Sequence, residues 1–498
     1  GVNYRLPDKE AHVWKRVMEP KAWHDEYLRS QALREEGIVA RTRLPARILK
    51  IPNLEVQLLI FSLRNFKCKF SKVNEVIKAV FIGPLIALLI GFLLRSANGD
   101  AYSLLDNRNL PLYQFLSVVV AIFLGLIASI DEIIGEQNIL EKEQYQEFSR
   151  FSYLNSKILY LFPVVAFQIL LYVLTGNYIL EIKGMYLVYW LVLFSCACFG
   201  VLLGLTYSAA AKSREFMYKA LLPLTIAVQL ILGGGIISYD RLNLGHHKYT
   251  PLMGDLMVSR WGYEALAVEQ FKNNAYEKLV YGDEKKLDQA SFYNFYVIPE
   301  MQRAFTACFS SDRDTVKKNI SLLQHEIKRA AALTGVYPFE YVNRMPEILK
   351  NEELAQELNG YITTYLASYY SDQFDTLSQK RSVRVAALTD SLGAARFDDL
   401  RRNYHNIALE QVVTNNQGEK AYKIVDNQIV RRSGMIYDTP DSKWGRAALF
   451  SPVKNFQFQE TDTLWFNLAV IWFFTSICYI WVLFDFSASI ASGFKLKV

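Results

Sequence analysis

The sequence predicts a mainly α-helical membrane protein, with a six-helix transmembrane domain and a large, mostly helical extracytoplasmic insertion between the fifth and sixth spans. Six apolar runs have the length of a membrane span, a charged segment at 131–157 separates two of them, and a polar block at 272–460 precedes the last. Although 51% of the 498 residues are hydrophobic, the mean hydropathy is close to zero. The apolar runs and the polar block are therefore two distinct parts of the chain.

Each apolar run is about 20 residues long, which is the length of an α-helix that crosses a bilayer. Short loops at 95–111 and 176–184 join spans on one side, and 131–157 and 210–215 join them on the other. The fifth run contains Gln229 and three consecutive glycines at 233–235, which loosen a helix end or let another helix approach closely. The predicted spans are Val76–Leu94, Leu112–Ile130, Ile158–Tyr178, Met185–Ala209, Phe216–Ile237 and Leu464–Phe484.

The distribution of basic residues orients these spans. Lysine and arginine cluster next to the first and fifth spans and at the C-terminus, at Lys495 and Lys497. Cytoplasmic loops carry such an excess, so both termini are expected in the cytoplasm and residues 272–460 outside. The net charge of +6 is then explained by the excess of basic residues on the cytoplasmic side of the membrane. Because the polar block lacks a basic patch with interleaved aromatic residues, nucleic acid is not an expected partner.

Cysteine usage bears on the polar block. Of the five cysteines, only Cys308 lies within 272–460, so no disulfide can form inside the block. Its stability must come from packing. The chain opens with polar residues, so no signal peptide is visible. The missing initiator Met suggests a processed or excerpted start.

The charged segment 131–157 contains Asp131, Glu132, Glu136, Glu143 and Glu147, between two apolar runs. Each charge costs several kcal/mol inside hydrocarbon, so the segment must lie in water beside the membrane. Its apolar residues, such as Leu140, are spaced so that a helix can present some of them to a partner protein.

Two motifs make a family resemblance specific. Phe151-Ser-Tyr-Leu154 with Lys157 and Pro163 follows the glutamate-rich loop, and Ser259-Arg-Trp-Gly-Tyr-Glu-Ala-Leu266 follows the fifth apolar run. In this order, they resemble the transmembrane half of G-subfamily ABC transporters, the white and pleiotropic-drug-resistance type of ABC-2 permease. The resemblance covers roughly residues 50–271 and the last span, and does not cover 272–460.

The resemblance implies a role for each part of the membrane region. Glu136, Leu140, Glu143 and Glu147 would couple to the ATPase, and Arg260, Trp261, Tyr263 and Glu264 would form a re-entrant signature in the outer leaflet. Trp261 and Tyr263 suit a membrane interface, and Arg260 and Glu264 lie four apart and can pair. The second and fifth spans would line a substrate cavity with Phe115, Phe123, Leu124, Gln229, Leu232 and Ile236. An apolar plug pair of the family would fall at Gly235 and Ile236, where this chain has only one bulky residue.

The implied organisation has six parts. These are a cytoplasmic linker (1–50) after a nucleotide-binding domain, an amphipathic connecting helix (51–75), spans one to five (76–237), re-entrant helices (238–271), the extracytoplasmic domain (272–460) and the last span with its tail (461–498). ATP and Mg would bind the nucleotide-binding domain, fused or separate, because the sequence has no Gly-x-x-x-x-Gly-Lys-Ser/Thr loop. Other implied partners are a second copy in a homodimer and membrane lipid.

The polar block has its own pattern. Helical spacing from Val316 to Ala331, with a stop at Gly335, predicts one long helix, and Ile362 to Leu377 predicts another. We expect a third helix at Leu400–Val413. Two strands, Tyr422–Val425 and Gln428–Arg431, predict a hairpin around Asp426-Asn427.

No motif in the sequence favours catalysis or a metal site. Ser451-Pro-Val-Lys454 fits Ser-x-x-Lys, but its proline disfavours a helix that would aim both groups together. His325-Glu326 has Arg329 where a zinc-protease helix needs a histidine. The sequence therefore favours an exporter of a hydrophobic or amphipathic, lipid-like substrate, in a bacterial inner membrane. The alternative is a mechanotransmitter that drives an extracytoplasmic protein partner or enzyme without transport.

Overall fold

The computed structural model describes residues 5–7, 14–16, 19–37, 52–71, 73–96, 102–143, 149–211, 213–239, 242, 249–309, 312–334, 336–415, 420–440, 442–457 and 459–494. The chain divides into two units, Gly1–Pro52 and Asn53–Val498. In the first unit, β1 (Arg5–Pro7) pairs with β2 (Trp14–Arg16), and α1 (Pro20–Gly37) follows. The rest of the description concerns the second unit.

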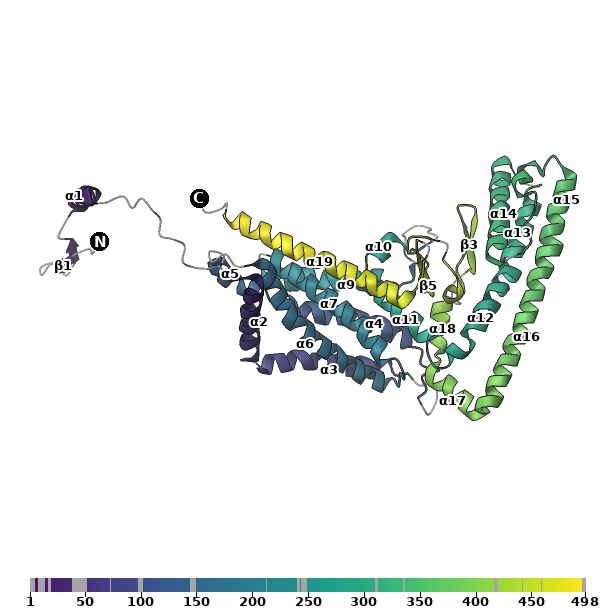
Figure 1. Ribbon diagram of the computed structural model, residues 1–498, viewed down its shortest axis with the longest axis horizontal. Helices are drawn as coiled ribbons and strands as arrows, with labels where there is room; N and C mark the ends of the chain where they lie inside the picture. The colour runs from purple at the N-terminus through teal and green to yellow at the C-terminus, as the bar shows by residue number, and fades with distance from the viewer. Residues whose placement is uncertain are drawn as a thin grey trace. The chain divides into compact units, whose positions relative to one another are not determined.

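Six helices of the second unit are long and apolar enough to cross a membrane, as the sequence predicts. They are α3 (Val73–Leu94), α4 (Leu110–Ser129), α6 (Arg150–Ile179), α7 (Tyr186–Ala210), α9 (Leu222–Leu232) with the preceding α8 (Arg214–Phe216) and π-helical turn (Met217–Leu221), and α19 (Thr463–Phe494). Helix α2 (Leu54–Phe70) packs against α6, α6 against α3, and α7 against both α4 and α19 (Figure 1).

Helices α4 and α7 approach each other closely because glycines lie at their contact. A Cβ atom added to Gly125 would lie 2.0 Å from the carbonyl oxygen of Ala197, and one added to Gly200 would lie 2.2 Å from that of Ile122. These two spans are also the most buried of the six, and α9 is the least buried. The α4–α7 pair is thus the packed centre of the membrane part.

The fifth span ends earlier than the sequence predicts. Helix α9 ends at Leu232, and Gly234 adopts φ +75° in the turn that follows. A Cβ atom at Gly235 would lie 2.2 Å from Cγ of Phe115. The glycine triplet therefore both ends the helix and lets this turn lie directly against α4, so the predicted extension to Ile237 is wrong.

After the fifth span, the short α10 (Leu252–Asp255) leads into α11 (Val258–Lys272), which packs against α4, α7, α9 and α19. The polar block then forms its own buried core of apolar side chains, including Leu323, Met345 and Leu358. Its helices are α12 (Glu277–Phe292), a π-turn (Tyr293–Val297), α13 (Ile298–Ala307), α14 (Arg313–Thr334), a 3-10 helix (Val342–Glu347), α15 (Glu352–Gly360), a π-turn (Tyr361–Leu366), α16 (Ala367–Leu392), α17 (Ala394–Tyr404) and α18 (Ile407–Thr414).

Several predictions for this block match the structure. Helix α14 covers the predicted Val316–Ala331, and the turn at 361–366 with α16 covers Ile362–Leu377. Strands β3 (Tyr422–Val425) and β4 (Gln428–Arg431) pair as an antiparallel hairpin, with positive φ at Asp426 and Asn427. Adjacent positive φ angles favour a tight hairpin turn.

Two features of this block differ from the prediction. The third helix expected at Leu400–Val413 is wrong, because the chain breaks at His405-Asn406 and Asn406 caps α18 by accepting a bond from the amide of Leu409. A second hairpin, β5 (Val453–Phe456) with β6 (Gln459–Asp462), was not predicted. All five cysteines are free.

Candidate functional site

An ionic cluster joins the segment after α4 to helices α2 and α6. We call Lys69, Glu132, Glu136, Tyr153 and Lys157 the loop cluster. Glu132 is buried and accepts hydrogen bonds from Lys69 and from Nζ of Lys157, the latter over 3.0 Å. Lys157 is only 1% exposed, so it is a charge held almost entirely by protein partners. Burial opposes the charge on Lys69, but the carboxylates of Glu132 and Glu136 raise its pKa above the usual value.

Glu136 completes the loop cluster from a 3-10 turn, Ile134–Glu136, that precedes α5 (Gln137–Glu143). Its carboxylate accepts from Nζ of Lys157 over 2.6 Å and from the Tyr153 hydroxyl over 2.8 Å. The turn itself is held by Ser208 of α7, whose Oγ accepts from the amides of Ile133 and Ile134, each over 3.0 Å. Residues from three helices, α2, α6 and α7, therefore fix the start of the predicted coupling segment.

The predicted coupling residues occupy different environments. The Glu136 carboxylate faces inward, to the loop cluster, and Leu140 of α5 is 4% exposed. Glu143 ends α5, but its side chain lies outside the described residues, as does all of Glu147. The geometry thus places Leu140 in the domain core and the partly exposed Glu136 against the loop cluster, and the role of all four residues in coupling stays a prediction.

Helix α2 buries several polar residues beside Phe61 and exposes several apolar ones. Its buried residues include Gln57 and Asn65, which bond to the amide of Ser149 and to Oγ of Ser156 at the start of α6. Leu59 and Leu63 are exposed. This arrangement is the reverse of a soluble surface helix, and it suits a helix whose outer face contacts lipid.

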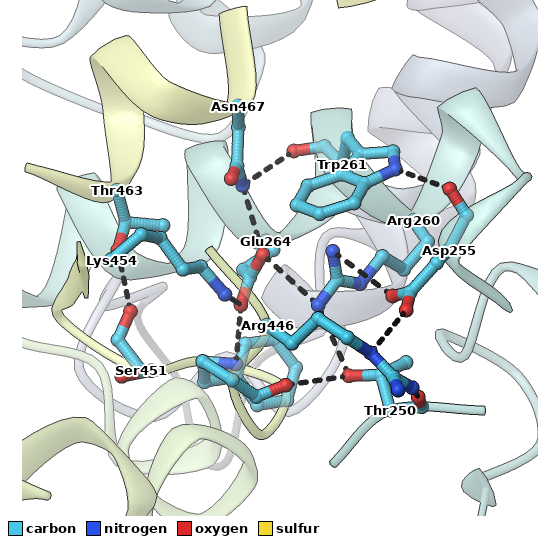
Figure 2. Close-up of polar contacts among 12 residues, drawn as sticks. Thr250, Asp255, Arg260, Trp261, Glu264, Arg446, Ser451, Lys454, Thr463 and Asn467 are labelled. Carbon is cyan, nitrogen blue, oxygen red and sulfur yellow. Dashed lines mark hydrogen bonds and ion pairs between the residues drawn. The ribbon is translucent and has the colours of Figure 1, made fainter. Parts of the chain in front are cut away.

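A second ionic cluster surrounds α11, and Figure 2 shows its residues converging from α11, β5 and α19. We call Asp255, Arg260, Glu264, Lys454 and Asn467 the α11 cluster. Glu264 is fully buried and accepts from Nζ of Lys454 over 2.7 Å and from the side-chain amide of Asn467 over 2.9 Å. Arg260, also fully buried, lies 3.6 Å from Glu264 and 3.7 Å from Asp255. The predicted pairing of Arg260 with Glu264 is therefore present.

Burial and charge compete in the α11 cluster. Burial lowers the pKa of Lys454 to about 8, although Glu264 works against this. Burial also opposes the charge on Glu264, but the cations of Arg260 and Lys454 hold its pKa below the usual value. Burial raises the pKa of Asp255. The guanidinium of Arg260 stacks on Trp261, with its central carbon 3.8 Å from the ring centroid.

The aromatic members of the signature lie inside the protein. Trp261 is 7% and Tyr263 1% exposed, where the sequence suggested rings at a membrane surface. The physical reason is that α11 packs on several helices at once, so Tyr263 contacts Phe115 of α4 and Phe450.

Ser451 and Lys454 do not act together, because Oγ of Ser451 donates to the carbonyl of Val453 while Lys454 bonds Glu264.

The predicted cavity residues divide into two groups. Phe115, Leu124 and Gln229 are buried within the protomer, and Gln229 ties α9 to α11 through the amide of Ser259 over 2.9 Å. Phe123 and Leu232 are half-buried, and Ile236 is 54% exposed. Only the second group can face a partner protomer or a shared space.

Comparison with known families decides what this arrangement is. Residues 56–271, which contain the loop cluster and all of α11 except Lys272, match the model of the ABC-2 type transporter family. This part of the chain is an ABC-2 type transporter domain. A search of curated proteins found no significant match. Members of this family are membrane-spanning components of ABC transporters and work with an ATP-binding domain, so residues 56–271 are similar to such a component.

The structure shows functional contacts that the sequence did not predict, both inside and beyond the ABC-2 match. Glu132 and Lys69 belong to the loop cluster, and Asn467 and Lys454 join α19 and β5 to α11. A buried charge needs a charged partner, so the position of Glu132 between two spans could have indicated the ion pairs of the loop cluster. No local sequence pattern indicates that Lys454 and Asn467 contact α11, because both lie far beyond the ABC-2 match in the sequence.

Proposed function

We propose that this chain is the transmembrane half of an ATP-driven ABC exporter of the G-subfamily type, which moves a hydrophobic or amphipathic, lipid-like substrate. The observation that carries the proposal is the loop cluster. Glu136, beside the short helix α5, is tied through Lys157 to α6 and, through Glu132 and Lys69, to α2. A push on α5 by an ATPase domain would reach a span and a lipid-facing helix together.

The substrate path in this proposal lies between two copies of the chain. Helix α9 is the least buried span in the protomer, and Phe123, Leu232 and Ile236 retain exposed surface. A homodimer that places α4 and α9 of both copies around one axis would cover this apolar surface. An apolar space with a few polar groups is what an amphipathic ligand requires. ATP and Mg would bind the nucleotide-binding domain.

The proposal includes a membrane orientation, with both termini in the cytoplasm, residues 272–460 outside, and a bacterial inner membrane as the location. Asn359 is exposed on α15, so a cysteine placed there should react with a membrane-impermeant maleimide in intact spheroplasts. Lys142 of α5 is also exposed, and a cysteine there should react only after lysis. The opposite pattern would invert the topology.

The decisive experiment measures ATP hydrolysis and lipid movement separately. We would reconstitute the chain with its ATPase domain in liposomes that contain a fluorescent phospholipid, and measure both ATPase rate and ATP-dependent lipid movement. Lys157→Met should lower lipid movement much more than basal ATPase, because it removes the ion pair between Glu136 and α6 and leaves only the Tyr153 hydrogen bond between them. Lys219→Met is the matched control, since Lys219 pairs with Glu215 at the exposed surface of the π-turn. Equal lipid movement in both variants would show that the loop cluster does not couple ATP hydrolysis to lipid movement.

A second function is favoured by the α11 cluster. Because Glu264 bonds both Lys454 of β5 and Asn467 of α19, motion of the spans would pass directly to the polar block. Asn406 of α18 adds a further link, since its side chain donates to the carbonyls of Leu104 and Asn107, just before α4. Such a chain could drive an extracytoplasmic partner without transport. ATPase activity that depends on the polar block, with no lipid movement, would favour this function.

A further inference from the structure

A groove of about 850 Å³ lies in the polar block between residues 337–341 and the helical stretch 357–372. Its walls are mainly aromatic. Tyr341, Phe339, Tyr361 and Tyr365 form a continuous series, with ring centroids 6.0, 5.1 and 5.4 Å apart in that order. Tyr337 adds a ring that is 75% exposed. The groove belongs neither to the loop cluster nor to the α11 cluster.

Hydrogen bonds fix the two walls relative to each other. The hydroxyl of Tyr361 donates to the carbonyl of Tyr337 over 2.7 Å, and the hydroxyl of Tyr365 accepts from the amide of Tyr337 over 3.1 Å. Phe339, which is 9% exposed, anchors the wall in the core of the block. The groove is therefore formed before any ligand binds, which lowers the entropy cost of binding.

The charge of the groove is negative. Glu340, Glu357 and Asp372 line it and are exposed, and no lysine or arginine is among the residues that line it. Arg344 lies near the end of the aromatic series, 5.8 Å from the Tyr341 centroid, but it bonds the carboxylate of Glu347. A ligand that brings positive charge would find unopposed carboxylates beside the rings.

We propose that this groove binds an extended, proline-containing polypeptide segment that carries arginine or lysine, supplied by a partner protein. A polyproline II segment is stiff before binding and docks in aromatic-lined grooves, where its proline rings fit between the aromatic rings. The tilts of 46° between Phe339 and Tyr361 and 33° between Tyr361 and Tyr365 leave ridges and slots of this kind. The three carboxylates would pair with the basic side chains.

The observations favour a polypeptide over a glycan. A sugar ring stacks on a flat, open aromatic face, but Phe339 is nearly buried and the rings beside it are tilted or edge-on to one another. A neutral glycan would also gain nothing from three negative charges. The proposal does not depend on whether a substrate crosses the membrane.

The test uses the full chain in lipid nanodiscs and a fluorescent synthetic peptide with a Pro-x-x-Pro core between arginines. Fluorescence polarisation should show saturable binding that weakens as salt is raised, and a peptide with glutamates in place of the arginines should bind at least about tenfold more weakly. Tyr365→Ala should weaken binding about tenfold or more, which is typical of an aromatic anchor. Tyr27→Ala, at an exposed tyrosine of the N-terminal unit, is the matched control and should not change it.

Variants of the exposed groove carboxylates separate recognition from folding. Glu357→Gln and Asp372→Asn together should reduce affinity for the arginine peptide and leave the thermal unfolding midpoint unchanged, because both side chains are exposed. Equal binding of the arginine and glutamate peptides, or no effect of Tyr365→Ala, would overturn the proposal. So would binding of a neutral oligosaccharide that the arginine peptide fails to displace.

Discussion

Nζ of Lys454 donates to the carboxylate of Glu264 over 2.7 Å, although the two residues are 190 positions apart and both are fully buried. The bond joins β5, near the end of the polar block, to α11, which leads into the block. Asn467 extends the link to α19. The two chain crossings between the membrane part and the polar block are therefore fastened to each other at one carboxylate.

Lys454→Met should destabilise the protein strongly. After the change, the buried Glu264 keeps Arg260, 3.6 Å away, as its charged partner but has lost Lys454. The loss of one member of a buried ion pair costs about 3–5 kcal/mol. The thermal unfolding midpoint in detergent should fall by several degrees. Lys420→Met, at an exposed lysine of the same block, should leave the midpoint unchanged. A midpoint that is equal for the two variants would show that the pair contributes no stability.

His405 should make stability depend on pH. It is buried, and Nδ1 lies 2.7 Å from Glu277 and Nε2 3.1 Å from Glu410. Burial opposes its charge, but hydrogen bonds to these carboxylates raise its pKa from 6.5 to about 9. The raised pKa means that the stabilisation is complete below pH 6.5 and is lost as the pH rises through 9, a change on the order of 3 kcal/mol.

The measurement compares the native chain with His405→Gln across this range. The difference between their unfolding midpoints should shrink steadily from pH 6.5 to pH 9. Lys454, whose pKa is lowered to about 8, also titrates here with the opposite sign, but it is present in both proteins and cancels in the difference. A difference that stays constant over this range would show that His405 carries no charge in the folded protein.

Local patterns predicted much of the fold. Hydropathy located six spans because bilayer thickness sets their length, and the Asp426-Asn427 pair marked the β3–β4 hairpin because both residues tolerate positive φ. The break between α17 and α18 was missed because apolar spacing continues across it. Asn406 was an available signal, since asparagine is a preferred residue before a helix start.

The ionic clusters were less predictable, for a different reason. Arg260 and Glu264 are one helical turn apart, so their pairing follows from spacing. Lys454 meets Glu264 only through tertiary packing, and its own neighbours in sequence suggested an unrelated motif. The inward direction of Glu136 likewise depends on Lys157, which comes from the next helix. Sequence spacing cannot fix contacts whose geometry is set by how separate elements pack.

Gly125→Ala should disrupt the centre of the membrane part. The added methyl would meet the Ala197 carbonyl at 2.0 Å, so α4 and α7 must separate. Overpacking of this kind costs about 1–3 kcal/mol or more, and the unfolding midpoint should fall. Gly282→Ala in α12 is the control, because its Cβ would meet nothing within 4 Å and alanine favours a helix by roughly 1 kcal/mol. A stable Gly125→Ala variant would mean that the two helices pack less closely than described.

The dimer axis gives the last prediction. If α4 and α9 of two copies enclose the substrate path, a cysteine at Phe123 should cross-link to its copy, whereas one at Trp481, exposed on α19, should not. Ile236, exposed after the glycine triplet, is the bulky residue available to close that path, so Ile236→Ala should raise basal ATPase activity. Trp472→Ala should instead lower stability, because its Nε1 donates to Ser195 over 3.2 Å and its ring contacts Phe162. Ready cross-linking at Trp481 together with none at Phe123 would place α19, and not α4, at the axis.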